Sequence, residues 1–366
     1  MTSDKNQMLE KKLNLSLRNY QIDFLKLIFS ICVVIYHSSF LIKEETRFQI
    51  PTALGWIAVH FFFIVSGFFM TKSITEKKYD PKNAGKMAYD YVIKKFKRIA
   101  LPYWIATLLF LITYIYINYG KVSVFNSLIS ALPELFAISM SGITLEYNFP
   151  VWYISAMFLV MLPLGYLLIK NKDFFLYCFA PLMALFLYGY MYQQENKFLF
   201  YKGGAGLCLN GIIRAGCGLC FGVITWLLYE ELQKKEMISY QKKIVTGIEG
   251  GITILFFYGI LFHKSSIATL FSLLLLLPIM IAIIFSEKSY FARFFQYKWM
   301  KKMDSISFSI YLNHAVARRI VNEYWKEISY WSGMAVFVFL ILVFCMIHFL
   351  LVKWVLFLWN RKRKKF

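Results

Sequence analysis

The feature that most constrains this chain is a series of long apolar segments with few interruptions. A helix needs about 20 mostly apolar residues to cross a bilayer, whereas a strand of a membrane barrel has about 10 residues of alternating polarity. The sequence shows the first pattern, in segments at roughly 22–42, 53–71, 99–119, 150–169, 174–192, 206–229, 244–262, 266–286, 304–325 and 333–358. It therefore predicts an all-α, polytopic integral membrane protein with about ten transmembrane helices.

The positive charge of the chain indicates its orientation in the membrane. A net charge of +21 could point to nucleic acid binding. However, in a ten-span arrangement that starts inside, the cytoplasmic stretches hold 29 of the 41 Lys and Arg residues and the outer loops hold 7. Such a bias sets membrane topology. We therefore predict cytoplasmic N- and C-termini, contact with the lipid bilayer of the plasma membrane, and no nucleic acid partner.

The chain is expected to form one integral membrane domain over residues 1–366. A polar cytoplasmic lead occupies residues 1–21, the helical bundle residues 22–358, and a basic cytoplasmic tail residues 359–366. Cys217 and Cys220 lie in the segment GCGLCFG, whose small residues we interpret as positions that let helices pack closely. We predict no metal site there, because further ligands of matching type do not occur nearby in the sequence.

The first apolar segment carries three ionisable residues, Asp23, Lys26 and His37. Such groups are costly in hydrocarbon and usually face a protein interior or a polar cavity. Lys26 and His37 are eleven residues apart, so they share one helix face and lie about 16 Å apart along the axis. Asp23 is close enough to Lys26 for an ion pair, which could also be an interfacial pair that reaches the headgroups.

Other apolar segments also contain polar residues. His60 and Ser66 lie in the second segment and Arg214 in the sixth. In the ninth, the residues that follow the i, i+4, i+7, i+11 spacing of one helix face are Ser307, Tyr311, His314 and Arg318. A polar stripe in a membrane helix must face protein or water. These faces therefore predict a common polar interior, which could be a transport path or a reaction chamber.

Three further ionisable residues are given plainer interpretations. Glu249 lies near the inner end of the seventh segment and is expected to be interfacial. We expect His263 and His348 to have no polar neighbours and interpret them as structural.

Short motifs in the first half of the chain resemble those of the membrane acyltransferase-3 family. Arg18, Asp23, Lys26 and His37 resemble the pattern R…D-x-x-R…H of its first helix, with lysine in place of the second arginine. The segment FFFIVSGFFM resembles F-F-x-x-S-G and places Ser66. These matches follow the family's order.

The resemblance continues through three more motifs. KKFKRIALPYW resembles R-x-x-R-I-x-P, with Lys95 at the first arginine and Arg98 at the second. VWYISAMFLV resembles L-W-F-L and places Trp152. SISFSIYLNHAV resembles S-Y-S-I-Y-L-x-H, and its matching residues are Ser307, Tyr311 and His314. Together the five motifs cover residues 18 to about 325, and their order makes the resemblance strong.

The resemblance implies acyl transfer from a cytoplasmic acyl-coenzyme A to a hydroxyl of a cell-surface polysaccharide or a lipid-linked sugar. Acetyl is the common acyl group of the family, and no bound cofactor is implied. Coenzyme A carries phosphates, so Lys26, Lys95 and Arg98 at the cytoplasmic end are the candidate donor-binding residues. Arg98 could alternatively be an ordinary positive-inside anchor.

His37 is the expected centre of the chemistry, as the base that takes the acceptor's proton or as a transient acyl carrier. Ser66, Tyr311 and His314 are candidates for orienting or polarising roles in catalysis. The polar residues expected to support this interior are Arg18, Asp23, Trp152, Arg214, Ser307 and Arg318. Arg318 and Arg319 are also candidates for binding an anionic acceptor.

Two other classes of function stay open on the sequence alone. A transporter or flippase for a lipid-linked sugar or an anion could use the same polar interior without covalent chemistry. A membrane sensor could use it only to bind a ligand. Transporters often show internal repeats and paired broken helices, which this sequence does not clearly show. The acceptor, the acyl group and the oligomeric state are left open.

Overall fold

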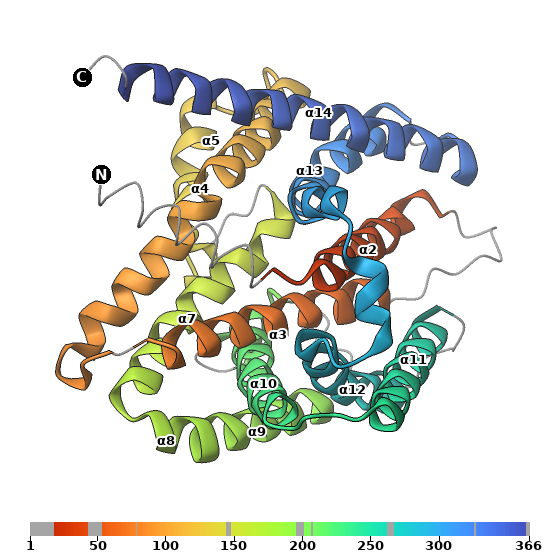
Figure 1. Cartoon of the computed structure of the whole chain (residues 1–366). Helices are drawn as coiled ribbons and strands as arrows, with labels where there is room; N and C mark the ends of the chain where they lie inside the picture. The colour runs from red at the N-terminus through yellow and green to blue at the C-terminus, as the bar shows by residue number, and fades with distance from the viewer. Residues whose placement is uncertain are drawn as a thin grey trace.

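The computed structural model describes residues 18–42, 53–77, 79–143, 148–194, 201–205, 208–261, 267–325 and 327–363. Helices make up most of these residues (Figure 1). The strands among them are two short antiparallel pieces, Gly204–Ala205 and Cys208–Leu209. The predicted all-α class is therefore confirmed.

Each of the ten predicted membrane segments overlaps a helix of the structure. In chain order these are α2 (Tyr20–His37), α3 (Ala53–Thr75), α4 (Ala84–Ile117), α7 (Trp152–Lys170), α9 (Ala180–Gln193), α10 (Asn210–Gln233), α11 (Ser239–Leu261), α12 (Ile267–Ser286), α13 (Met303–Tyr324) and α14 (Tyr330–Arg363). The short α8 (Lys172–Phe174) and a π-helical turn, Phe175–Phe179, precede α9. Two short helices, α5 (Val124–Ser130) and α6 (Leu132–Leu135), connect α4 to α7.

Seven segments of the described chain are long and apolar enough to cross a membrane by length and composition. They contain α2, α3, α4, α7, α8–α9, α10 and α14. The helices α11, α12 and α13 fall outside these criteria. In α13 the charges of Asp304, Arg318 and Arg319 interrupt the apolar sequence. The structure thus supports a membrane protein with several apolar spans, and the count of ten stays a prediction.

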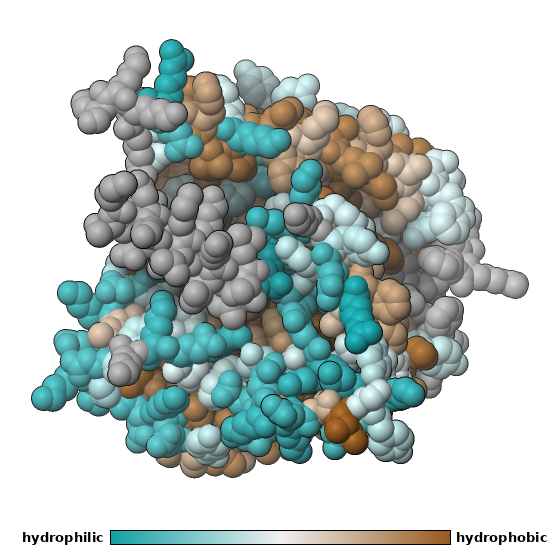
Figure 2. Space-filling model, in the orientation of Figure 1, coloured by the Kyte–Doolittle hydropathy of each residue, from teal (hydrophilic) through white to brown (hydrophobic). Residues whose placement is uncertain are grey.

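The surface of α14 carries large apolar side chains that face outward. Phe339, Leu342, Met346 and Leu350 are each about 60% exposed. In Figure 2 hydrophobic residues cover α14 along the upper rim of the molecule, whereas hydrophilic residues gather over the centre and lower part of the same face. Lipid tails are as apolar as these side chains, so this helix surface is suited to the hydrocarbon of a bilayer.

Glycines allow α3 and α10 to pack very closely at the centre of the bundle. A Cβ added at Gly67 would lie 2.2 Å from the backbone oxygen of Leu219, and one at Gly222 would lie 2.4 Å from that of Ile64. Both contacts are shorter than real Cβ atoms make, so only glycine fits. Cys220 lies in the same buried interface. The interpretation of GCGLCFG as a close helix contact is therefore confirmed.

Helix α2 packs against both α3 and α13. Figure 1 shows α2 between α13 and α3 in the middle of the molecule. Its polar stripe is consequently enclosed by helices that carry polar residues of their own.

Candidate functional site

Helices α2 and α13 run parallel, with their polar stripes facing each other in a constant register. Lys26 Nζ lies 2.7 Å from a carboxylate oxygen of Asp304, 278 residues later in the chain. The hydroxyls of Ser30 and Ser307, 277 residues apart, lie 2.8 Å from each other. The rings of His37 and His314 stack with centroids 5.2 Å apart. We call this series of contacts the polar ladder. In the predicted orientation, the end at Lys26 is its inner end and the end at His37 is its outer end.

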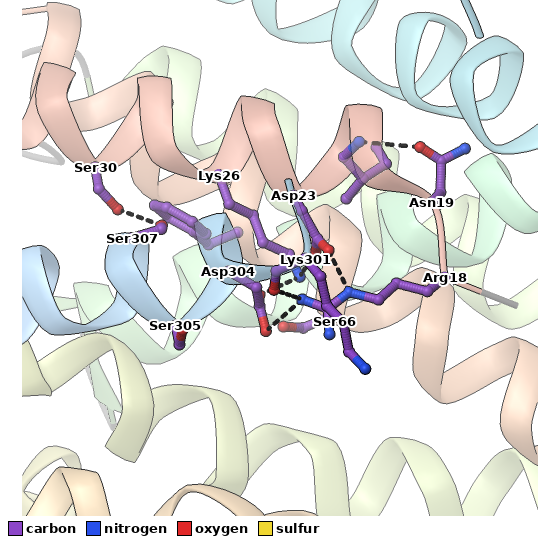
Figure 3. Close-up of polar contacts among 12 residues, drawn as sticks. Arg18, Asn19, Asp23, Lys26, Ser30, Ser66, Lys301, Asp304, Ser305 and Ser307 are labelled. Carbon is purple, nitrogen blue, oxygen red and sulfur yellow. Dashed lines mark hydrogen bonds and ion pairs between the residues drawn. The ribbon is translucent and has the colours of Figure 1, made fainter. Parts of the chain in front are cut away.

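Two basic and two acidic side chains form an ion network at the inner end (Figure 3). Arg18 Nε lies 2.6 Å from Asp23, and Lys26 Nζ lies 3.4 Å from Asp23. Asp304 completes the network through Lys26, and Arg18 also donates to the Lys301 carbonyl at 2.6 Å. The predicted contact between Asp23 and Lys26 is present. Because Asp23 is buried, this network holds α2 to α13 and is more than an interfacial pair.

Lys95 and Arg98 add positive charge to the same end from α4. Lys95 lies close enough to Lys26 and Arg98 to be repelled by both of their charges. In the described part of the chain, neither Lys95 nor Arg98 has a carboxylate partner. Cations that repel one another without a counter-ion favour the binding of an anion.

The middle of the bundle holds two hydroxyl contacts beside the ladder. The half-buried Ser66 lies 3.1 Å from the hydroxyl of Tyr153, which also donates to the Phe62 carbonyl at 3.2 Å. The Tyr311 hydroxyl donates to the Pro150 carbonyl at 2.9 Å. The structure therefore brings Ser66 to Tyr153 and not to the histidines, and it anchors the Tyr311 hydroxyl to the start of α7.

The outer end is a cluster of two imidazoles and a guanidinium around the ring of Phe149. The Arg318 guanidinium donates to His37 Nδ1 at 3.3 Å. His314 Nδ1 donates to the Tyr311 carbonyl at 2.8 Å. The Phe149 ring lies 4.7 Å from that of His37 and 5.5 Å from that of His314. His37 is half-buried and His314 is fully buried, so the cluster lies largely out of contact with water.

A second cation lies near this cluster, on α10. The Arg214 guanidinium lies 4.8 Å from the Trp152 ring, which stacks on Tyr201 with centroids 4.8 Å apart and 5° between the planes. Arg214 is only 3% exposed, and its charge interacts with His60 and with Tyr311. The predicted polar residues Trp152, Arg214 and Arg318 therefore gather at the outer half of the bundle.

Sequence reasoning missed two residues of the site, Asp304 and Phe149, and the buried carboxylate of Glu134, which holds the residue before Phe149. Asp304 lies in the first turn of α13, and its place three residues before Ser307 on the polar stripe was the available signal. Glu134 is a buried carboxylate in α6 that accepts from the Asn148 amide at 3.1 Å, and its isolation in an apolar stretch was the only sign. Phe149 directly follows Asn148. The sequence contains no signal for it, because one more aromatic residue is not distinctive in a chain with 37 phenylalanines.

Two expectations from the sequence are corrected by the structure, and a third falls outside the described residues. His348 does have polar company, since its Nδ1 lies 2.8 Å from the Ser309 hydroxyl and its Nε2 lies 2.9 Å from the Pro102 carbonyl. These contacts join α14 to α13 and α4, which supports a structural role. Glu249 is buried and bonds Gln21, so it is not simply interfacial. His263 lies outside the described residues.

A comparison with family models matches residues 19–353 to an acyltransferase domain, the model of the acyltransferase-3 family. Comparisons with curated proteins and with solved structures give no significant match. The family match spans the polar ladder from its inner to its outer end.

Proposed function

Because the chain belongs to the membrane acyltransferase-3 family, we propose that it transfers an acyl group from cytoplasmic acyl-coenzyme A to a hydroxyl of a carbohydrate. The acyl group we propose is acetyl. The acceptor is a cell-surface polysaccharide or a lipid-linked sugar, and the enzyme works in the plasma membrane. The observation that carries this proposal is the polar ladder, with excess cations at one end and paired imidazoles at the other.

The inner end suits the phosphates of coenzyme A. Lys95 and Arg98 have no carboxylate partner within the described residues, and an arginine can bind a phosphate through two hydrogen bonds. Lys26 is already paired with Asp304 at 2.7 Å. It contributes to donor binding only by exchanging that carboxylate for a phosphate. The extended arm of coenzyme A then runs along the ladder toward the histidines.

The outer end suits the transfer itself. An imidazole takes the proton of the acceptor hydroxyl, and the hydroxyl oxygen attacks the carbonyl carbon of the thioester. The carbon–sulfur bond breaks, the thiolate receives the proton, and an ester and free coenzyme A result. An imidazole can act here as the base or as a transient acyl carrier, and the expectation from the sequence gives this role to His37. Arg318 and Arg214 supply positive charge near the developing negative charge.

Membranes that contain the protein test this proposal directly. Incubation with labelled acetyl-coenzyme A should place label in carbohydrate and release one thiol per ester formed. His37→Ala should reduce the transfer by at least about 100-fold, as expected for the loss of a group that acts on the transition state as a base or as a hydrogen-bond donor, with the protein still inserted in normal amount.

Movement of a lipid-linked sugar without any thiol release would instead favour the transporter or flippase. Loss of one ester from the surface glycans of a deletion strain would identify the acceptor. Full transfer by His37→Ala would remove the assignment of His37.

A further inference from the structure

We propose that the two stacked imidazoles have different roles in the transfer. His314 takes the acceptor's proton at Nε2, and His37 donates a hydrogen bond from Nε2 to the carbonyl oxygen of the thioester. This inference rests on the proposed function, because it assigns roles within the same site. It differs from the expectation that His37 is the base.

The backbone contact of His314 fixes its tautomer. A carbonyl oxygen can only accept a hydrogen bond, so the 2.8 Å contact between His314 Nδ1 and the Tyr311 carbonyl requires a proton on Nδ1. In the neutral ring Nε2 then carries the lone pair. This atom is buried and has no hydrogen-bond partner among the described residues. A buried acceptor that is left unpaired is costly, and an incoming hydroxyl would satisfy it.

The contact of His37 with Arg318 fixes the opposite tautomer. A guanidinium can only donate, so at 3.3 Å from Arg318 the Nδ1 of His37 must accept. Neutral His37 consequently carries its proton on Nε2. While Arg318 stays in place, His37 offers a donor at Nε2 and no lone pair there. A neutral imidazole that polarises a carbonyl oxygen is a known arrangement in enzymes.

The charged and titratable groups around His37 and His314 are compatible with the two assigned tautomers. Among the described residues, Arg318 is the cation that faces both rings, and the titratable side chains in ring contact with them are Tyr36 from α2 and Tyr311 from α13. Both are tyrosines, which are neutral near pH 7. Arg214 from α10 interacts with these two tyrosines. In the described chain, no carboxylate contacts either imidazole.

The proposed acyl transfer conserves every proton and accounts for each bond that forms or breaks. Nε2 of His314 removes the proton of the acceptor hydroxyl, and the oxygen forms a bond to the carbonyl carbon. Nε2–H of His37 stabilises the negative charge on the carbonyl oxygen. When the intermediate collapses, the carbon–sulfur bond breaks and the His314 imidazolium returns its proton to the thiolate. Both rings end in the tautomers in which they began.

Nitrogen NMR of the full chain in bilayers measures the tautomers without any substrate. The chain has 5 histidines, so ¹⁵N-histidine labelling gives a tractable spectrum, and His37→Gln and His314→Gln assign the two signals. We expect a proton on Nε2 of His37 and on Nδ1 of His314. A proton on Nε2 of His314, or on Nδ1 of neutral His37, would overturn the inference.

Paired substitutions test the roles by activity. Glutamine at position 37 can accept from Arg318 and still donate, so His37→Gln should keep at least tenfold more kcat than His37→Ala. Glutamine cannot act as a base, so His314→Gln should be as slow as His314→Ala and should lose the fall in rate at acid pH. His348→Gln removes a buried imidazole elsewhere and should keep its kcat per inserted molecule.

The opposite pattern, an inactive His37→Gln beside an active His314→Gln, would overturn the assignment and leave the acyltransferase proposal standing. The absence of any transfer by the unaltered protein would count against the proposed function, and the tautomers would still be read by NMR.

Discussion

At the scale of single residues, the cations of the inner end fall into two groups. Arg18 and Lys26 are neutralised by Asp23 and Asp304. Among the described residues, the charges that act on Lys95 are those of Lys26 and Arg98, which repel it. The departures of this chain from the family's arginines, at Lys26 and Lys95, therefore have different consequences. At position 26 a lysine can pair with both carboxylates as a point charge. At position 95 a lysine cannot form the bidentate hydrogen bonds to a phosphate that an arginine forms.

Arg98 is the residue whose loss should affect the donor most. We expect Arg98→Ala to raise the KM for acetyl-coenzyme A about 10- to 100-fold, because a hydrogen bond to a charged group contributes about 1.5–3 kcal/mol. The kcat at saturating donor should change little. Lys94→Ala, which removes an exposed charge on the same helix, is the matched control and should leave both constants unaltered. If the two substitutions had equal effects, Arg98 would contribute to the orientation of the protein in the membrane and not to donor binding.

The sequence predicts which residues are polar in the membrane but not all of their partners. The periodicity of α13 identifies Ser307, Tyr311, His314 and Arg318, and the structure places them along one ladder or beside it. The sequence does not single out Asp304, because an acidic residue in the first turn of a helix is already explained by its favourable interaction with the helix dipole. The partners of His348 come from helices far away in the chain, which no local pattern can indicate.

At the scale of helices, rotation and register are what the sequence leaves undetermined. The stripe on α2 and the stripe on α13 can each be derived from a spacing of 3.6 residues. That they lie in parallel, with Ser30 against Ser307, depends on packing between helices. Packing between helices also determines the rotation of α3 about its axis. Ser66 on α3 bonds Tyr153 on α7, although the sequence of α3 does not indicate which neighbouring helix Ser66 faces.

The close approach of α3 and α10 gives a prediction for this scale. Gly222→Ala should lower the thermal stability of the purified protein, because its Cβ would overlap the Ile64 backbone at 2.4 Å and force the helices apart. Such overpacking costs about 1–3 kcal/mol. Gly247→Ala is the control, since a Cβ there meets nothing within 4 Å, and alanine should raise helix stability by up to about 1 kcal/mol. Unfolding followed in detergent measures both variants. A Gly222→Ala protein as stable as the parent would mean that the helices are not in contact there.

At the scale of the whole molecule, the direction of α14 limits the number of membrane crossings. Gly333 at its start packs against Leu41, just after α2, and Phe337 lies 5.6 Å from Phe40. Further along, His348 bonds Ser309 in the first half of α13. Helix α14 therefore begins at the outer end of the ladder and runs back, antiparallel to α2. An even number of crossings satisfies this arrangement, as in the predicted ten, whereas the seven apolar segments alone would leave α14 parallel to α2.

The side of the membrane that holds residue 327 distinguishes these alternatives. With ten crossings the turn between α13 and α14 is extracellular, and with seven it is cytoplasmic. In a background without the six cysteines, we expect Glu327→Cys to react with a membrane-impermeant maleimide on intact cells, as Asn126→Cys in α5 should. Lys235→Cys, between α10 and α11, should react only after permeabilisation. Protection of position 327 together with labelling of position 126 would show that α11, α12 and α13 do not cross as three spans. The polar ladder would then lack the membrane-spanning frame that separates the proposed donor site from the proposed acceptor site.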